Sequence, residues 1–222
     1  MITPFPGENF VNVELRTEEG IQRAIDLNVI GSGLVDVVFA SRLNQVKSIF
    51  HPPSNQARCF TLMRHPVDRA VSLFYYLKNA AHEQSYNKEM SDMNIDEYIE
   101  SKKAESDWMT RSLAQDKLQG GVLDEDDLFR AMKFLRTKCV IGLTSKFSVS
   151  YRRFEAYFEL GSPDQAGCEN KIMGDLALTT KGHPKVKPGS KTWRALEDLN
   201  HYDMKLYNYA VQLFEEQGQL FA

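Results

Sequence analysis

The strongest structural signal in the sequence is a short apolar run that ends in an arginine and leads directly into a helix. Residues Cys59 to Met63 are apolar apart from one threonine, which predicts a buried strand that ends at Arg64. Pro66 suits the first position of a helix, where no hydrogen-bonded N–H is needed. Apolar residues then recur at helical spacing, at Val67, Ala70, Val71, Phe74 and Leu77. The predicted unit is therefore a strand, a tight turn and a helix.

The rest of the chain also alternates strands with helices. Cys139 to Leu143 is a second short apolar strand, and a strand is predicted over Leu34 to Phe39, after the turn Gly31-Ser32-Gly33. Helices are predicted over Ile95–Ser101, Asp107–Gln115, Asp126–Arg136, Ser148–Leu160 and Trp193–Gln217. This alternation predicts an α/β fold, with a mainly parallel sheet flanked by helices and a helix-rich carboxyl-terminal half.

The 222 residues have the size and composition of a single domain, with 42% hydrophobic and 26% charged residues. Residues 1–27 are predicted to be an irregular start, in which Thr17 can begin a short helix that reaches Leu27. Residues 161–190 are predicted to be mostly loop, because prolines and glycines interrupt them repeatedly.

The charge balance excludes some classes of partner. The chain has 27 Lys and Arg against 30 Asp and Glu, a net charge of -3, so it has no general basic field for nucleic acid or an anionic membrane. No apolar stretch approaches the roughly 20 residues of a spanning helix. The sequence as written therefore predicts no membrane segment and no secretion signal.

The three cysteines, Cys59, Cys139 and Cys168, are too few and too scattered to predict a disulfide framework or a thiolate metal site. Cys59 and Cys139 lie in apolar runs, where we expect small buried side chains rather than reactive thiols.

The turn at Arg64 has the chemistry of an anion site. An arginine at the carboxyl end of a parallel strand, directly before a helix, places a permanent cation beside unpaired backbone N–H groups. Arg64 can bind phosphate oxygens through two parallel hydrogen bonds, and the hydroxyl of Ser72 can donate another. The alternative is a proline-capped surface helix that binds no ligand.

Residues 64–74 match R-x-P-x-x-R-x-x-S-x-[FY], and this segment resembles an element of sulfotransferases that use 3'-phosphoadenosine 5'-phosphosulfate (PAPS). The resemblance implies that Arg64 and Ser72 bind the 3'-phosphate of the nucleotide, with Pro66 and Arg69 in structural positions. It also implies a P-loop-NTPase-like sheet and PAPS as co-substrate, without a metal.

Other segments are similar to the Golgi carbohydrate branch of that family and to related algal proteins. Asp107 to Leu113 resembles an N-W-M-x-R-x-L helix, although Asp107 replaces the usual Asn and so offers a carboxylate instead of a neutral amide. Two further matches are Val140–Thr144 followed by Arg153-Phe154-Glu155, and Asn200–Tyr207. The resemblance covers roughly residues 28–218.

The segment Lys181 to Arg194 carries five positive charges and no acid. In the enzymes it resembles, a loop before the last helix folds across the nucleotide, which implies that Lys187 and Lys191 are further phosphate contacts. A solvated loop whose lysines bind nothing is the alternative.

Two parts of a sulfotransferase site are not found in the sequence. The 5'-phosphosulfate loop, P-K-[TC]-G-[GT]-[TS], is absent, and Gly31-Ser32-Gly33 is followed by neither Lys nor Thr. No catalytic base can be assigned among the candidates, which are His51, His65, His82 and Glu83. We expect His65 to have a capping or packing role instead.

The expected function is transfer of a sulfuryl group from PAPS to a hydroxyl acceptor, a carbohydrate by analogy with the branch. An amino-terminally incomplete enzyme would explain the missing loop, and its compartment would then be the Golgi lumen or membrane by the same analogy. The alternatives are a degenerate relative that binds the nucleotide or a partner without catalysis, and an unrelated helical scaffold.

Overall fold

In this computed structural model of the protein, the described residues are 11–41, 43–50, 57–79, 88–101, 103–114, 121–159, 167, 170–172, 174 and 183–221. The chain divides into two compact units. Unit 1 comprises Met1–Cys59 and Met109–Phe134, and unit 2 comprises Phe60–Trp108 and Leu135–Ala222. The assignment of the whole chain to one sulfotransferase-like domain stays a prediction.

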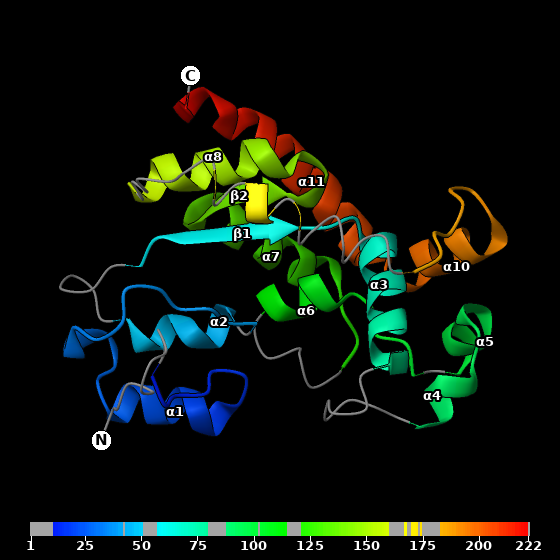
Figure 1. Ribbon diagram of the computed structural model, residues 1–222, viewed down its shortest axis with the longest axis horizontal. Coiled ribbons are helices and arrows are strands. Elements are labelled where there is room, and N and C mark those ends of the chain that lie inside the picture. The colour runs from blue at the N-terminus through cyan, green and yellow to red at the C-terminus, as the bar shows by residue number, and fades with distance from the viewer. Residues whose placement is uncertain are drawn as a thin grey trace. The chain divides into compact units, whose positions relative to one another are not determined.

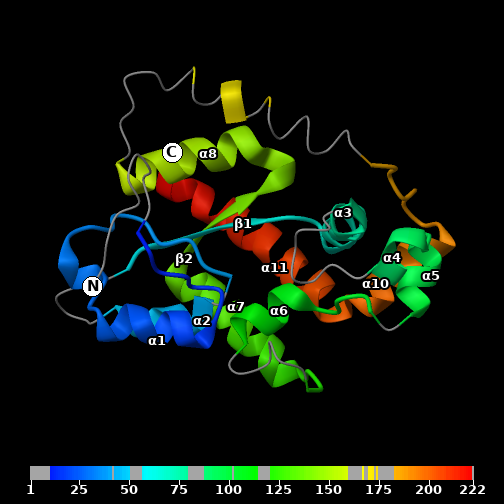
Figure 2. The same ribbon diagram turned by 60° about the horizontal axis from the view of Figure 1, so that its bottom comes forward.

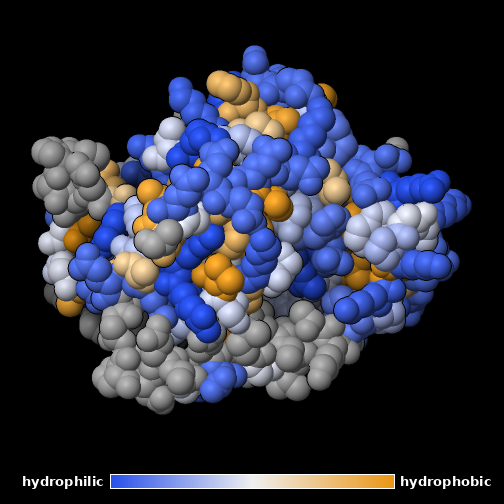
Figure 3. All heavy atoms as spheres, turned by 90° about the horizontal axis from the view of Figure 1, so that it is seen from above, coloured by the Kyte–Doolittle hydropathy of each residue, from blue (hydrophilic) through white to orange (hydrophobic). Residues whose placement is uncertain are grey.

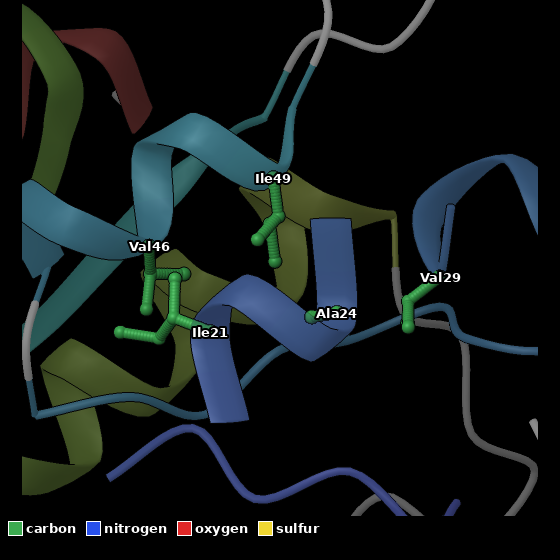
Figure 4. Packing of buried hydrophobic residues seen from close by; sticks show 5 residues of the cluster. All are labelled: Ile21, Ala24, Val29, Val46 and Ile49. Atoms are coloured by element: carbon green, nitrogen blue, oxygen red, sulfur yellow. The ribbon is translucent and has the colours of Figure 1, made fainter. Parts of the chain in front are cut away.

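Unit 1 is built from short helices around a small apolar core. It contains α1 (Glu18–Asp26), η1 (Ile30–Ser32), α2 (Leu43–Val46), η2 (Lys47–Ile49), nearly all of α6 (Trp108–Leu113) and most of α7 (Glu125–Lys138). Thr17 begins α1 as the sequence predicts, because its hydroxyl accepts a hydrogen bond from the N–H of Gly20. The core consists of Ile21, Ala24, Val29, Val46 and Ile49 (Figure 4).

The strand predicted over Leu34–Phe39 is wrong. Residues 34–40 are neither helix nor strand. Val35 and Val38 pack against the core of unit 1, whereas the side chains of Leu34 and Phe39 are exposed. The two packed residues are three positions apart and Val37 between them is exposed, so burial here does not follow the two-residue period of a strand.

Apart from Cys59, unit 2 contains a two-stranded parallel sheet of β1 (Cys59–Met63) and β2 (Cys139–Leu143). Both strands lie where the sequence predicts them. Residues of β2 are all buried, and α8 (Phe147–Phe158) and α11 (His201–Gln217) pack against it (Figures 1 and 2). The confirmed fold class is thus a helix-rich mixture of α and β structure with a small parallel sheet.

Side chains close the outer edge of β2. Gln217 accepts a hydrogen bond from the N–H of Ile141 and donates one to the carbonyl of Cys139, both at 2.9 Å. Ser150 accepts from the N–H of Leu143 at 2.8 Å and donates to the same residue's carbonyl at 3.1 Å. The backbone N–H and C=O groups that make these bonds belong to residues 139, 141 and 143, which face the same edge of the strand. The bonds therefore take the place of those that a neighbouring strand would make.

A second group of helices packs around α3 (Pro66–Asn79). It consists of α4 (Lys88–Asp92), α5 (Ile95–Glu100) and α10 (Lys191–Leu199), which lie beside α3 in both ribbon views (Figures 1 and 2). Val67, Ala70 and Val71 of α3 form a buried cluster with Leu196 of α10. The apolar stripe of α3 therefore packs against α10, as its helical spacing indicates.

The single helix predicted over Trp193–Gln217 is two helices. Asn200 separates α10 from α11 and leaves the helical conformation, with φ -117° and ψ 38°. Its side chain donates to the carbonyl of Leu196 at 2.9 Å and accepts from the N–H of Asp107 at 3.1 Å. Because asparagine competes for backbone hydrogen bonds in this way, it breaks a helix where a suitable partner is present.

The loop predicted over residues 161–190 is only partly described. Residues 183–190 are neither helix nor strand and include a turn, whereas residues 170–172 are helical. The remaining short elements are η3 (Thr144–Lys146) and η4 (Gly218–Phe221).

The expectation of reduced cysteines is wrong for two of the three. Cys59 and Cys139 are both disulfide-bonded. They are the first residues of β1 and β2. Cys168 lies outside the described residues.

One face of the molecule is mainly polar. Figure 3 shows polar residues over most of one face, with apolar residues in small groups between them. Within the described residues, no helix combines the length and the hydropathy that crossing a bilayer requires.

Candidate functional site

The structure places Arg64 and Ser72 on the strand, turn and helix that the sequence predicts. Arg64 directly follows β1, and Ser72 lies in the second turn of α3. Both side chains are half-buried. The first N–H groups of a helix have no acceptor within the helix, and α3 begins two residues after Arg64.

The four predicted binding residues are Arg64, Ser72, Lys187 and Lys191. Their side chains make no hydrogen bond or ion pair with any other residue in the described ranges. Lys187 and Lys191 are exposed. The donors of these four side chains are thus not engaged by the described part of unit 2.

Arg69, the second arginine of the motif, has a structural role. Its Nη2 donates to Glu105 Oε2 at 2.8 Å, and its guanidinium lies 4.4 Å from the ring centroid of Trp108. A cation over an aromatic face is attracted by the ring quadrupole. Arg69 therefore joins α3 to the segment around Trp108, so two sequence motifs that lie far apart in the chain meet in unit 2.

The basic segment 183–194 runs back along α3. The ring of His183 stacks on Tyr75, with centroids 5.3 Å apart and an angle of 6° between the planes. Val186 packs against the cluster around Val67. The ring of Trp193 lies 5.1 Å from that of His65, the residue before α3. The segment therefore starts near the third turn of α3 and ends at its amino terminus.

Lys187 and Lys191 lie between these contacts, in the part of the segment that approaches the amino end of α3. A turn is closed by the N–H of Ser190, which donates to the carbonyl of Lys187 at 3.1 Å. Gly189 within this turn has φ 76°, a conformation that favours glycine. Ser190 then caps α10 by accepting from the N–H of Trp193.

Lys191 is thus the first residue of α10, two residues before the predicted start of this helix. Since Trp193 contacts His65, the amino ends of α10 and α3 lie close together. Each helix start carries partial positive charge. Together with Arg64, this arrangement is suited to an anion with several oxygens.

His65 packs between two aromatic side chains. The centroid of its ring lies 5.1 Å from that of the Trp193 ring in α10 and 5.3 Å from that of the Tyr207 ring in α11. Its Nδ1 is buried and has no hydrogen-bond partner in the described structure. Burial lowers the pKa of His65 below 6.5, against the opposite effects of Asp68 and Glu197, so the imidazole is uncharged at neutral pH.

Asp107 has a defined contact at the position where the resembling proteins have Asn. Its carboxylate Oδ1 accepts from the N–H of Asp203 in the first turn of α11 at 2.9 Å. Only an acceptor oxygen is needed for this bond, so a carboxylate can make it as well as an amide can. The bonds of Asp107 and Asn200 thus join Asp107 to the matched segment 200–207 within unit 2.

The other candidates for a catalytic base cannot be placed in the site. His51, His82 and Glu83 lie outside the described residues. No group of three or more His, Cys, Asp or Glu side chains suited to a metal ion occurs in the described part of the chain. A small hollow beside Arg69 and Glu105 is lined by none of the four predicted binding residues.

The sequence reasoning missed the aromatic contacts that position the basic segment. Tyr75, His183 and Trp193 lie within four positions of predicted site residues, but no local spacing pairs Tyr75 with His183 or Trp193 with His65. A partial signal was Ser190, a favoured helix-capping residue directly before Lys191.

Comparison with known proteins identifies no relative. No family model matches the chain, and no curated protein or solved structure is significantly similar to it.

Proposed function

We propose that the chain is a PAPS-dependent sulfotransferase-like domain with a P-loop-NTPase-like parallel sheet, and that its β1–α3 turn binds the 3'-phosphate of the nucleotide. Arg64 supplies two hydrogen bonds to the phosphate, and Ser72 supplies a hydroxyl. Lys187 and Lys191 provide further positive charge. The motif of residues 64–74 and the helix that follows each strand support this proposal.

The observation that carries the proposal is the course of the basic segment. Sequence similarity alone pairs Arg64 with lysines more than 120 residues away. In the structure the contact between His65 and Trp193 places the start of α10 beside the start of α3. The predicted phosphate turn and the predicted basic segment are therefore neighbouring parts of unit 2.

The reaction proposed for this site is transfer of the sulfuryl group of PAPS to a hydroxyl acceptor, with a carbohydrate as the acceptor class. The disulfide-bonded state of Cys59 and Cys139 favours an oxidising compartment, as the analogy with Golgi enzymes requires. Both the acceptor class and the compartment rest on that analogy.

Nucleotide binding without transfer is the second candidate function. The sequence has no P-K-[TC]-G-[GT]-[TS] element, whose backbone N–H groups and lysine would stabilise the leaving phosphate. His65, the one candidate base in the described residues, is packed between two rings. Incubation with PAPS and a panel of hydroxyl acceptors separates the two functions, because only transfer gives a sulfated product.

Binding itself is tested by calorimetric titration with 3'-phosphoadenosine 5'-phosphate (PAP) against adenosine 5'-phosphate. We expect PAP to bind more tightly, because only PAP carries the 3'-phosphate. Arg64→Ala should weaken PAP binding by about 10–100-fold, since a hydrogen bond to a charged group contributes about 1.5–3 kcal/mol. Ser72→Ala should weaken it less, because it removes a neutral donor.

Arg152→Ala is the matched control, since it removes an exposed arginine from α8 in the same unit. It should leave PAP affinity within about twofold of the wild type, because a remote surface charge is screened by salt. Equal affinity for PAP and adenosine 5'-phosphate, or equal losses in the Arg64 and Arg152 variants, would contradict the proposed site.

A further inference from the structure

His65 has no assigned part in the proposed site, yet its ring contacts the basic segment at Trp193, in addition to the packing of Val186 and Leu196 near Val67. It lies between Arg64 and Pro66, and its carbonyl accepts the N–H of Arg69 at 2.9 Å. Its backbone is therefore fixed by the proline that follows it and by the first turn of α3. The ring consequently projects from a rigid support.

The ring of His65 contacts both helices that follow the basic segment. Trp193 belongs to the first turn of α10, and Tyr207 is a buried residue of α11. The planes of His65 and Trp193 are inclined at 32°, whereas His65 and Tyr207 meet edge to face at 70°. Aromatic pairs at such separations contribute about 0.5–1.5 kcal/mol beyond the area they bury.

Trp193 is itself held in place from both sides. Its N–H donates to the hydroxyl of Ser190, and its indole Nε1 donates to Glu197 Oε1 at 2.7 Å. The position of this ring therefore determines where Ser190 and Lys191 lie. A ring that contacts Trp193 can therefore influence the positions of the lysines in the segment without touching the ligand.

We propose that His65 is a positioning residue, whose ring between Trp193 and Tyr207 docks the start of α10 and thereby holds Lys187 and Lys191 next to Arg64. This inference rests on the proposed binding function. The contacts of the ring are aromatic ones, with Trp193 and Tyr207, and the buried Nδ1 has no hydrogen-bond partner in the described structure.

The proposal predicts different effects for two substitutions of His65. His65→Ala removes the ring and should weaken PAP binding by about tenfold, because the lysines are then no longer held in place. His65→Phe keeps an uncharged ring and should leave PAP binding within about threefold of the wild type. Calorimetric titration with PAP measures both, and thermal unfolding shows whether each variant is folded.

A double-mutant cycle separates positioning from a general loss of stability. In a chain that already carries Lys187→Ala and Lys191→Ala, His65→Ala should cause little further loss of PAP affinity, since there is no lysine left to position. A purely structural role would instead give the same loss in both backgrounds. Additive losses would therefore overturn the proposal.

Fluorescence supplies a readout that does not depend on PAP. Trp108→Phe leaves Trp193 as the sole tryptophan. In that background His65→Ala should shift the Trp193 emission to longer wavelength, because the indole becomes hydrated, whereas His65→Phe should not. Unchanged emission in the alanine variant would refute the docking contact.

The outcomes distinguish this inference from the function on which it rests. If the wild-type chain does not bind PAP, the proposed function fails and the positioning role fails with it. If the wild type binds PAP through Arg64 but His65→Ala binds equally well, only the positioning role is refuted. If His65→Phe binds PAP as weakly as His65→Ala, an uncharged aromatic ring is not sufficient at this position and the proposal is again overturned.

Discussion

Replacement of Asp107 tests the contact that joins the segment around Trp108 to the terminal helix. Asp107 is 7% exposed and has a left-handed backbone with φ 50°. Its Oδ1 accepts the N–H of Asp203, a residue that is 1% exposed. Asp107→Ala would leave this N–H without that partner at the start of α11 and would place a residue with no polar side chain in a left-handed conformation.

The expected cost follows from these two terms. Loss of a capping side chain costs about 1 kcal/mol, and a left-handed conformation costs an ordinary residue about 1–2 kcal/mol. Asp107→Ala should therefore lower the free energy of unfolding by about 2–3 kcal/mol, a fall of about 4–12 °C in Tm for a chain of this size. Urea unfolding followed by circular dichroism measures the change.

Asp107→Asn is the informative comparison. Asparagine keeps an acceptor oxygen and tolerates the left-handed conformation, so its free energy of unfolding should stay within about 1 kcal/mol of the wild type. Asp198→Ala, at an exposed position of α10, controls for loss of a carboxylate and should change stability by no more than about 0.5 kcal/mol. If the asparagine variant is as unstable as the alanine variant, the hydrogen-bonding argument is refuted.

Three further measurements test other parts of the structure. Gln217→Leu removes both side-chain hydrogen bonds to β2 and should lower the free energy of unfolding in urea by about 2–4 kcal/mol, because two buried backbone groups lose their partners. Gln212→Leu, at an exposed position of α11, is the control, and an equal effect of both substitutions would contradict this prediction. Because the pKa of His65 is lowered from 6.5, the unfolded state binds more protons near that pH, so stability should fall as the pH decreases below about 6.5. His65→Phe should weaken that dependence, and an unchanged pH profile would count against it. Cys59 and Cys139 are disulfide-bonded, so alkylation of the unfolded chain should modify one cysteine before reduction and three after it. Modification of all three cysteines before reduction would disprove the disulfide.

The sequence was sufficient where the structure depends on neighbouring residues. The strand at Cys59–Met63, the helix that begins at Pro66 and the strand at Cys139–Leu143 were all predicted with their bounds close to those observed. In each case the spacing of apolar residues defines the element, and a proline or a polar residue beside it marks its end, so no distant residue is needed. Arg64 was placed at a strand end for the same reason.

The predictions failed where a distant residue decides the outcome. Asn200 breaks the terminal helix partly through a bond from Asp107, which lies 93 positions earlier in the chain. Leu34–Phe39 has a strand-like pattern but pairs with no strand. The contacts of Trp193 with His65 and of His183 with Tyr75 likewise depend on the path of the chain rather than on local spacing.

Because side chains occupy the outer edge of β2, the small sheet can accept a further strand on one side only. Gln217 and Ser150 occupy the backbone groups that another strand would need on that side. Both side chains come from helices that also bury β2, so a new strand could not pair there without displacing packed structure. Any strand added to this sheet, by insertion, fusion or association with another chain, would therefore have to extend it from β1, the strand that delivers Arg64.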